Sequence, residues 1–363
     1  MASTTMSKLT TVRDQAVKRY FLMLDLARAI PWRGAWKLHD RNADIVVWIH
    51  HRYPKSWLTY LLREDTILKD AGLIAGLVKA KVPFRIVSGK GAEQLTGATI
   101  LATVHPYNPD RAQDYAAGLL VALRRIEAKG NTLCPSADEA EWWENKVFMH
   151  RRFDELGINC PRTRVDVLTE SLDFNSLHYP LLAKEPHSQG SAGLHKIDSA
   201  EALRRLRADL RSQGETELLL QDLVDMGRDL RATMVGDRVV HHYFRINTGT
   251  EWQPTSTRRG SLVDFETFPE KWRTRIGDVF ALTGMRTGAF DICWSGDDLD
   301  GEPIFLEVSP SYTPNPPPPP AFADQPYYAF KKQLRGPDSF GRAFVRVVFE
   351  IQEMVLEEWG ITS

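Results

Sequence analysis

Two segments in the last quarter of the chain, 288–294 and 303–309, alternate apolar and polar residues with the period of a β-strand. The stretch between them, 295–302, is rich in Gly and Asp, which favours a turn. If the hairpin is centred on this turn, Asp291 and Glu307 face each other across the two strands. The opposite face is then apolar at every position and consists of Phe290, Ile292, Trp294, Ile304, Leu306 and Val308.

The two facing carboxylates, Asp291 and Glu307, need a physical explanation. Cross-strand neighbours have Cβ atoms roughly 5 Å apart, and like charges at that distance destabilise a sheet unless a cation joins them. Mg²⁺ takes oxygen ligands, often together with the phosphates of a substrate. The pair is therefore a candidate magnesium site, and a solvated hairpin face that carries two acids is the alternative.

Apolar strands alternate with helical stretches between residues 44 and 136, and the strands fall at 45–49, 83–87 and 98–104. This alternation predicts a parallel sheet. In such sheets the ligand-facing residues lie just past the carboxyl ends of the strands. No G-x-G-x-x-G motif follows the first strand, which disfavours dinucleotide binding. Each residue at these strand ends is a candidate substrate contact or an ordinary polar loop residue: His50, His51, Arg52, Ser88, Lys90, His105 and Tyr107.

A candidate phosphate site follows in the next block. Residues 140–156 predict a helix that carries Lys146, and the strand 179–186 places Lys184 near its end. The loop 188–193 consists mostly of small residues, so its backbone amides can cradle phosphate oxygens. It is no Walker loop, because no G-K-[ST] closes it, and a flexible turn between strands is the alternative.

The apolar strand 218–221 leads into a short connection, 222–226, and then into the strand 227–235. An adenine ring could pair with the backbone of this connection, and Asp229 could accept hydrogen bonds from ribose hydroxyls. Arg231 lies two residues on, on the same face, and could reach toward phosphates. A surface salt bridge between these two residues is the alternative.

In this order, the parts resemble the motifs of the ATP-grasp ligases. The superfamily includes D-alanine–D-alanine ligase, glutathione synthetase and amino-acid ligases that extend peptides. The resemblance covers residues 44–316. It is carried by Asn145-Lys146, Lys184 before the small-residue loop, the hinge 220–223, the run 227–231, Asp291, and the run 307–310.

The resemblance implies a mixed α/β and α+β fold, in which a Rossmann-like parallel-sheet domain precedes a two-subdomain ATP-grasp fold. We expect five parts along the chain. They are a helical extension (1–43), the parallel-sheet domain (44–136), the small ATP-grasp subdomain with Lys184 (137–225), the large subdomain with the metal-binding hairpin (226–325) and a C-terminal helix that packs on the core (326–363).

The resemblance also implies which residues bind ATP and one or two Mg²⁺ ions. The metal ligands are Asp291, Glu307 and Ser309; Ser309 stands where the family usually has Asn, so occupancy of a second metal site stays open. The implied contacts to the ATP phosphates are Lys146 and Lys184, together with Ser188, Gly190 and Ser191 of the phosphate loop. The implied adenine hinge is Gln221, Asp222 and Leu223, and the implied ribose contact is Asp229.

Many relatives have an arginine two residues before the first metal-binding acid to hold an acyl phosphate, and here that position is Ala289. If the chemistry is retained, Arg231 or Arg245 must take over this task beside Lys184. The implied reaction activates a substrate carboxylate with ATP as an acyl phosphate and joins it to an amine. A kinase that uses the same fold, and a nucleotide-binding protein without turnover, are the alternatives.

Three segments have no assigned motif. Residues 247–261, which include Arg258, form a lid, a substrate clamp or a surface loop. The run Pro316–Pro320 favours polyproline II, either as a rigid exit from the active site or as a docking motif. Residues 339–359 have apolar positions at helical spacing and predict a helix that packs on the grasp domain or forms an oligomer contact, such as a homodimer.

Composition narrows the function classes. The net charge of −1 argues against binding to nucleic acid or an anionic membrane surface. Three widely spaced cysteines, and the lack of a signal-like or long apolar segment, predict a cytoplasmic protein without disulfides. Basic residues near the proposed cleft favour a carboxylate-bearing small molecule or peptide as substrate, joined to an amine. The candidate substrate contacts are Arg52, His105, Tyr107 and Arg258.

Overall fold

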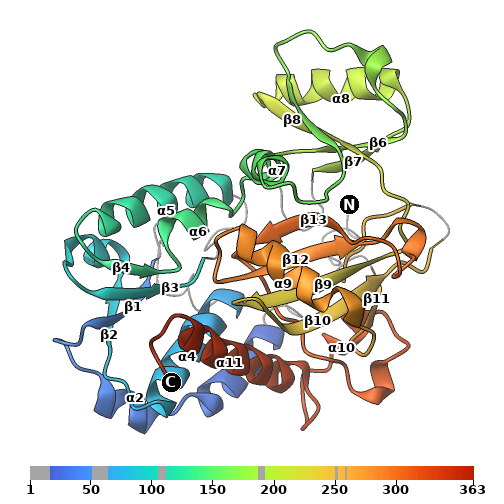
Figure 1. Cartoon of the computed structure of the whole chain (residues 1–363). Coiled ribbons are helices and arrows are strands. Elements are labelled where there is room, and N and C mark those ends of the chain that lie inside the picture. The colour runs from blue at the N-terminus through green and yellow to red at the C-terminus, as the bar shows by residue number, and fades with distance from the viewer. Residues whose placement is uncertain (1–16, 51–63, 105–111, 187–192, 250–251, 258–259) are drawn as a thin grey trace, which may run out of the picture. The chain divides into compact units, whose positions relative to one another are not determined.

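The computed structural model describes residues 17–50, 64–104, 112–186, 193–249, 252–257 and 260–363. These residues form two compact units (Figure 1). Unit 1 contains the described residues up to Ala140 together with Ser311–Ser363, and unit 2 is Glu141–Pro310. Several predicted site residues lie outside the described part of the chain: His51, Arg52, His105, Tyr107, Ser188, Gly190, Ser191 and Arg258.

Unit 1 is built around the predicted parallel sheet. Its strands, in the spatial order β2-β1-β3-β4, are all parallel. The three strands predicted from the sequence are confirmed, and a short fourth strand extends the sheet beyond β3. The strand bounds are β1 (Ile45–Ile49), β2 (Arg85–Ser88), β3 (Thr99–Ala102) and β4 (Thr132–Cys134).

Helices surround this sheet, and a buried apolar core that includes Val47, Leu73 and Leu101 lies between the layers (Figure 1). The predicted helical extension contains two helices within the described residues, 17–29 and α2. None of the described helices is both long and apolar enough to cross a membrane. The other elements of unit 1 are α2 (Trp32–Leu38), α4 (Glu64–Lys79), α5 (Ala112–Glu127), α6 (Ala137–Glu141), α10 (Tyr327–Phe330), α11 (Phe340–Glu358), η1 (Gly89–Gln94) and η6 (Pro320–Phe322).

The sequence predicted that the C-terminal helix packs on the grasp domain or forms an oligomer contact, and α11 packs on α4 within unit 1. Two glycines of α4 explain the close approach. A Cβ atom on Gly72 would lie 2.8 Å from Cγ of Gln352, and one on Gly76 would lie 2.6 Å from Cδ1 of Leu356. Helical spacing predicted the apolar face of α11, but the face that receives it is set by the small residues of α4.

The proline run lies against aromatic residues of the same unit. Pro316 is buried, and its carbonyl oxygen accepts a hydrogen bond from the hydroxyl of Tyr327 at 2.6 Å. Tyr327 in turn packs edge-on against Phe330 and Phe340. The start of the run is thus fixed by its own chain, which favours a rigid exit from the preceding strand over a free docking motif.

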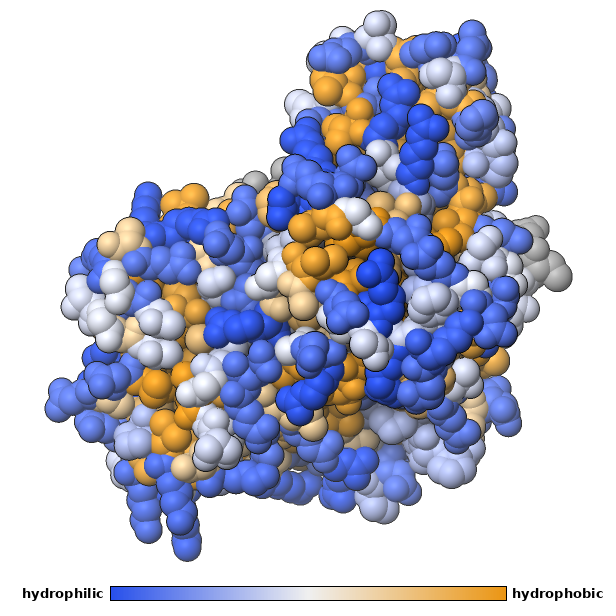
Figure 2. Space-filling model, in the orientation of Figure 1, coloured by the Kyte–Doolittle hydropathy of each residue, from blue (hydrophilic) through white to orange (hydrophobic). Residues whose placement is uncertain are grey.

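The first part of unit 2 is a small antiparallel sheet of order β5-β8-β6-β7, covered on one face by α8 (Figure 1). Leu203 and Leu210 of α8 pack with Leu181, Leu218 and other buried residues in one core. Hydrophilic side chains cover much of the outer face of α8 (Figure 2). The elements are β5 (Thr163–Val167), η3 (Phe174–Ser176), β6 (Leu181–Lys184), β7 (Leu194–Ile197), α8 (Ala200–Ser212) and β8 (Glu217–Asp222).

The second part of unit 2 is a five-stranded antiparallel sheet of order β11-β10-β9-β12-β13. One face packs against α9 and α7 through a large apolar core that includes Phe153, Phe280 and Phe290. The elements are α7 (Lys146–Glu155), β9 (Arg228–Val235), β10 (Arg238–Ile246), β11 (Leu262–Asp264), η4 (Glu270–Trp272), α9 (Arg273–Leu282), β12 (Thr287–Cys293), η5 (Ser295–Asp297) and β13 (Ile304–Ser309).

The predicted hairpin is formed by β12 and β13, with one correction to its apolar face. Asp291 pairs with Glu307 and Ile292 with Phe305, so Leu306 is the extra residue of a β-bulge. The bulge brings Phe305 into the core at 0% exposure, whereas the sequence had assigned Leu306 and Ile304 to that face. Both are only half-buried, because strict alternation breaks down where an extra residue is inserted.

The predicted single helix 140–156 is two helices. α6 ends at Glu141 and α7 begins at Lys146, with Glu144 between them at a positive φ of 53°. The side chain of Asn145 accepts a hydrogen bond from the amide of Phe148 and so caps the start of α7. Lys146 is therefore the first residue of a helix.

Candidate active site

Asp291 and Glu307 lie directly across β12 and β13 from each other, as the alternation predicted. The side chain of Asp291 is 13% exposed. Within the described residues, the Glu307 side chain forms no hydrogen bond or ion pair. The hairpin thus presents two neighbouring acids, of which only Asp291 already has close partners.

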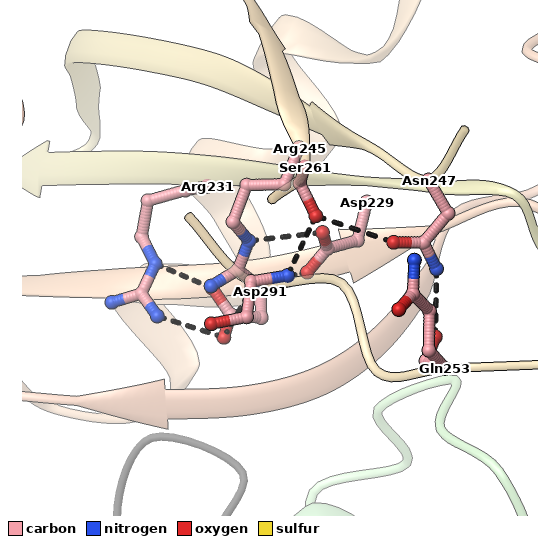
Figure 3. Close-up of polar contacts among 8 residues, drawn as sticks. Asp229, Arg231, Arg245, Asn247, Gln253, Ser261 and Asp291 are labelled. Atoms are coloured by element: carbon pink, nitrogen blue, oxygen red, sulfur yellow. Dashed lines mark hydrogen bonds and ion pairs between the residues drawn. The ribbon is translucent and has the colours of Figure 1, made fainter. Parts of the chain in front are cut away.

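Two arginines neutralise Asp291 (Figure 3). Nε of Arg231 lies 2.6 Å from Oδ1, and its Nη2 donates a hydrogen bond to Oδ2 at 2.9 Å. Nη2 of Arg245 lies 3.0 Å from the same Oδ2. Burial alone would raise the pKa of Asp291, but the two guanidinium groups hold that pKa below its ordinary value. The charge of the Asp291 carboxylate is therefore compensated by two arginine side chains.

Arg245 also binds Asp229, which is 1% exposed. Its Nε donates to Oδ1 of Asp229 at 3.0 Å, and its Nη2 pairs with Oδ2 (Figure 3). Burial raises the pKa of Asp229, while Arg245 acts in the opposite direction. The pKa of Arg245 is raised, because the two acids outweigh its burial. The surface salt bridge considered for Asp229 and Arg231 is wrong, since Arg231 pairs with Asp291 on the neighbouring strand.

The loop between β10 and β11 lies beside this charge network. The hydroxyl of Thr255 bonds to the carboxylate of Asp229. Nδ2 of Asn247 donates to the carbonyl of Gln253 at 2.7 Å, and Ser261 bonds both Asn247 and the amide of Ser256. Thr255 and Ser256 are each 7% exposed. The described part of 247–261 is thus packed and hydrogen-bonded, which argues against a simple surface loop.

A second group of polar residues lies on the small sheet, on the face opposite the α8 core. Lys184 of β6 and Gln221 of β8 share this face with Thr163 of β5. Burial lowers the pKa of Lys184 to about 8; Glu307 and Asp291 raise it, and the charge of Lys146 lowers it further. These charges act on one another, so the structure brings the two predicted lysines and the two predicted acids into one electrostatic neighbourhood.

The connection after β8 begins at Leu223, one residue later than the sequence predicted. Gln221 and Asp222 are part of β8, where they pair with β6, and only Leu223 belongs to the connection. No sequence motif indicated what holds this connection in place. The carboxylate of Asp297 accepts hydrogen bonds from the amides of Gly227 and Arg228 at 3.0 and 3.2 Å. A Cβ on Gly227 would lie 2.7 Å from that carboxylate, so a side chain at this position would displace the carboxylate from the two amides.

His150 is a further residue of this group that sequence reasoning missed. It lies on α7, four residues after Lys146, and its Nε2 is 3.4 Å from Nε2 of Gln221. Burial lowers the pKa of His150 to about 3, and Lys184 and Lys146 lower it in the same direction. The i, i+4 spacing from a predicted phosphate-binding lysine was the one available signal.

Of the predicted strand-end positions in unit 1, three are described. His50 is fully buried, contacts the carbonyl oxygen of Thr103 through Nε2 and packs against the ring of Trp48 at 5.2 Å between centroids. Ser88 and Lys90 are exposed. His50 is therefore a polar residue of the core at the carboxyl edge of the sheet.

Asp291 and Glu307 carry the kind of oxygen ligand that Mg²⁺ prefers. Among the described residues, no group of three or more His, Cys, Asp or Glu side chains could hold a metal ion by itself. Mg²⁺ is usually held through one or two carboxylates together with substrate phosphates and water. Asp291, Glu307 and the hydroxyl of Ser309 supply hard oxygen donors of this kind on adjoining strands. They therefore fit a metal that arrives with a nucleotide.

Known structures share this arrangement of sheets. D-alanine–D-alanine ligase from Bacillus anthracis complexed with ATP is 13% identical over 86% of this chain and 99% of its own, with a TM-score of 0.53. The ATP-grasp ligase PsnB complexed with a minimal precursor is 14% identical over 88% and 99%, with a TM-score of 0.52. D-cycloserine synthetase DcsG is 12% identical over 84% and 99%, with a TM-score of 0.53.

The chain therefore has the fold of the ATP-grasp ligases, and the resemblance inferred from its motifs is confirmed at the level of fold. No protein-family model matches the sequence, and no curated protein matches it. At such low sequence identity the likeness concerns architecture alone, so the chemistry has to be argued from the residues of this chain.

Proposed function

We propose that this protein is an ATP-dependent ligase that joins a carboxylate to an amine. In the first step an oxygen of the substrate carboxylate attacks the γ-phosphorus of ATP, the bond to the β,γ-bridging oxygen breaks, and ADP leaves. In the second step the amine attacks the acyl carbon, and the bond from that carbon to the phosphate oxygen breaks. Inorganic phosphate leaves, and the nitrogen loses a proton. The product is an amide or a peptide-like bond.

The main support is the register of Asp291 with Glu307, in a fold whose structural neighbours include ATP-bound and Mg- and ADP-bound ligases. A protein that only bound nucleotide would not need two adjoining acids flanked by two arginines and a lysine. Phosphoryl transfer requires alignment of the reactants and neutralisation of phosphate charge more than covalent help. The cluster supplies both requirements from rigid strands.

Each residue has a role in this proposal. Lys146 and Lys184 bind the phosphates, and the backbone from Gln221 to Leu223 lines the adenine. Asp291 and Glu307, with Ser309, would hold Mg²⁺, which would neutralise phosphate charge when bound.

The arginines stabilise the acyl phosphate. Ala289 leaves no cation at the position where many ligases of the superfamily have one. Arg231 reaches Asp291 from the neighbouring strand β9, and Arg245 reaches it from β10, one strand farther away. Positively charged donors fixed in place before the reaction stabilise developing negative charge without reorganisation. Loss of one such donor typically costs about 3 kcal/mol of barrier.

The substrates we propose are a small-molecule or peptide carboxylate and an amine. The neighbouring structures include a D-alanine–D-alanine ligase and a ligase complexed with precursor peptide PsnA2, so both substrate sizes occur within this fold. Basic residues on the site face, Arg231 and Arg245 among them, favour an anionic substrate.

The test is release of ADP and phosphate by the purified protein with Mg²⁺ and ATP, screened with pairs of carboxylic acids and amines. We expect ADP release to require a carboxylic acid, and hydroxylamine to trap the acyl phosphate as a hydroxamate detectable by mass spectrometry. A stable phosphorylated product would indicate a kinase instead. ATP binding with no turnover under any substrate mixture would contradict the ligase proposal.

A further inference from the structure

His150 is part of α7, the helix that packs on the large sheet of unit 2 and also contacts the small sheet. Its neighbours in the helix, Met149 and Phe153, belong to the core of the large sheet. His150 follows Lys146 by four residues on the same side of the helix, at the edge of this apolar stripe. His150 is 6% exposed and lies against Gln221 on the lysine-bearing face of the small sheet.

The hydrogen bonds around His150 define its tautomer. Nε2 of Gln221 donates to the hydroxyl of Thr163 at 2.7 Å and lies 3.4 Å from Nε2 of His150. In this orientation of Gln221 the amide nitrogen can only donate, which makes the imidazole Nε2 the acceptor and favours the neutral tautomer with its proton on Nδ1. With a pKa lowered to about 3 by burial and by the two lysines, the ring stays neutral over the working range of an enzyme.

This tautomer leaves a donor without an acceptor. Nδ1 of His150 is fully buried and forms no hydrogen bond within the described part of the chain. A buried donor without a partner destabilises a folded protein, so such groups are rare unless a ligand completes them. Lys146 and Lys184 both act on this ring electrostatically, which makes an anionic oxygen the complementary acceptor.

We propose that His150 is a further nucleotide-binding residue, whose Nδ1–H donates a hydrogen bond to a phosphate oxygen of the bound nucleotide between Lys146 and Lys184. The inference rests on the proposed ATP site and adds a neutral donor to its two cations. Gln221 acts as the positioning residue, because its amide fixes the imidazole tautomer.

Three substitutions at this position separate the donor from the shape of the ring. His150→Asn keeps an amide donor close to Nδ1, His150→Gln moves it to the position of Nε2, and His150→Phe removes both nitrogens. Calorimetric titration with Mg-ADP is expected to give a Kd raised about tenfold or more for the Gln and Phe variants and less than about threefold for Asn. His178→Phe, an exposed site on the same subdomain, is the matched control and should bind as the wild type does.

A spectroscopic measurement on the wild-type protein does not depend on how the variants fold. In protein labelled with ¹⁵N-histidine, we expect the Nδ1-protonated tautomer for His150 and a downfield shift of its Nδ1 proton on saturation with Mg-ADP. An Nε2-protonated ring, or resonances that do not move, overturns the inference.

The outcomes also distinguish this inference from the proposed function. If the wild type binds Mg-ADP and the Gln and Phe variants bind within about twofold of it, only the role of His150 is wrong. If the wild type binds no nucleotide at all, the proposed function fails and the role of His150 fails with it.

Discussion

Nη2 of Arg245 lies 3.0 Å from Oδ2 of Asp291, while the same nitrogen pairs with Asp229 on the strand between them. One guanidinium group therefore bridges two acids of the large sheet, the buried Asp229 and the partly buried Asp291. Removal of one member of such a cluster leaves charge uncompensated in a site of low exposure. The arrangement links the stability of the sheet to the geometry proposed for catalysis.

Glu307→Gln should abolish turnover and leave the fold intact. The side chain forms no hydrogen bond or ion pair among the described residues, so an isosteric amide should change the free energy of unfolding by less than about 0.5 kcal/mol. Loss of the second carboxylate should lower kcat by at least about 100-fold. Steady-state ADP release and thermal unfolding measure the two effects. Glu302→Gln, an exposed position on the same hairpin, is the control, and near-normal rates in Glu307→Gln would remove the metal assignment.

Asp229→Asn distinguishes two roles for one carboxylate. Its contacts to Arg245 predict a positioning role, so kcat should fall while the Kd for Mg-ADP changes less than about threefold. The ribose role implied by the motif predicts the reverse, a weaker Kd. Because the buried partner of Arg245 is removed, the free energy of unfolding should fall by about 3 to 5 kcal/mol. Calorimetry and single-turnover rates decide between the roles.

The lowered pKa of Lys184 predicts a pH dependence of nucleotide binding. With a folded pKa of about 8, below the ordinary value of 10.5, the lysine loses its charge in the folded protein as pH rises past 8. The Kd for Mg-ADP should therefore increase between about pH 7 and 9. Lys184→Arg should flatten this profile, since arginine keeps its charge. A profile that is the same in both proteins contradicts the assignment of Lys184 to the phosphates.

The lowered pKa of Lys184 also makes the free energy of unfolding depend on pH. Between about pH 8 and 10.5 the unfolded chain binds a proton at Lys184 that the folded chain has lost, so this group makes the free energy of unfolding rise with pH in that window. Lys184→Met removes the contribution. Urea unfolding of both proteins at pH 7.5 and 10 measures this effect. From pH 7.5 to pH 10, the free energy of unfolding of the wild type should rise relative to that of Lys184→Met.

Gly72→Ala should destabilise unit 1 although alanine favours helices. The new Cβ would lie 2.8 Å from Cγ of Gln352 on α11, and overpacking of this kind costs about 1 to 3 kcal/mol. The double variant Gly72→Ala with Gln352→Ala removes the opposing atom. We expect its loss in urea unfolding to be smaller than the sum of the two single variants. Strict additivity would mean that the two helices do not meet at this point.

Much of the site followed from local periodicity. Alternation along β12 and β13 was enough to place Asp291 opposite Glu307, because a hairpin brings sequence neighbours together through one turn. Alternation could not reveal the bulge at Leu306, since an inserted residue leaves no mark on composition. The boundaries of α7 were also missed, because the break before Lys146 depends on the backbone of Glu144 and the cap by Asn145.

The sequence by itself determined the strands, the helical faces and the order of the motifs, because these depend on residues close together in the chain. Only the tertiary structure decided which charges meet. Arg231 and Asp291 are 60 residues apart, and they pair because β9 lies beside β12 in the sheet. The packing of α11 on the glycines of α4 and the contact of His150 with Gln221 have the same origin. Such contacts depend on the packing of elements distant in sequence, which no local pattern specifies.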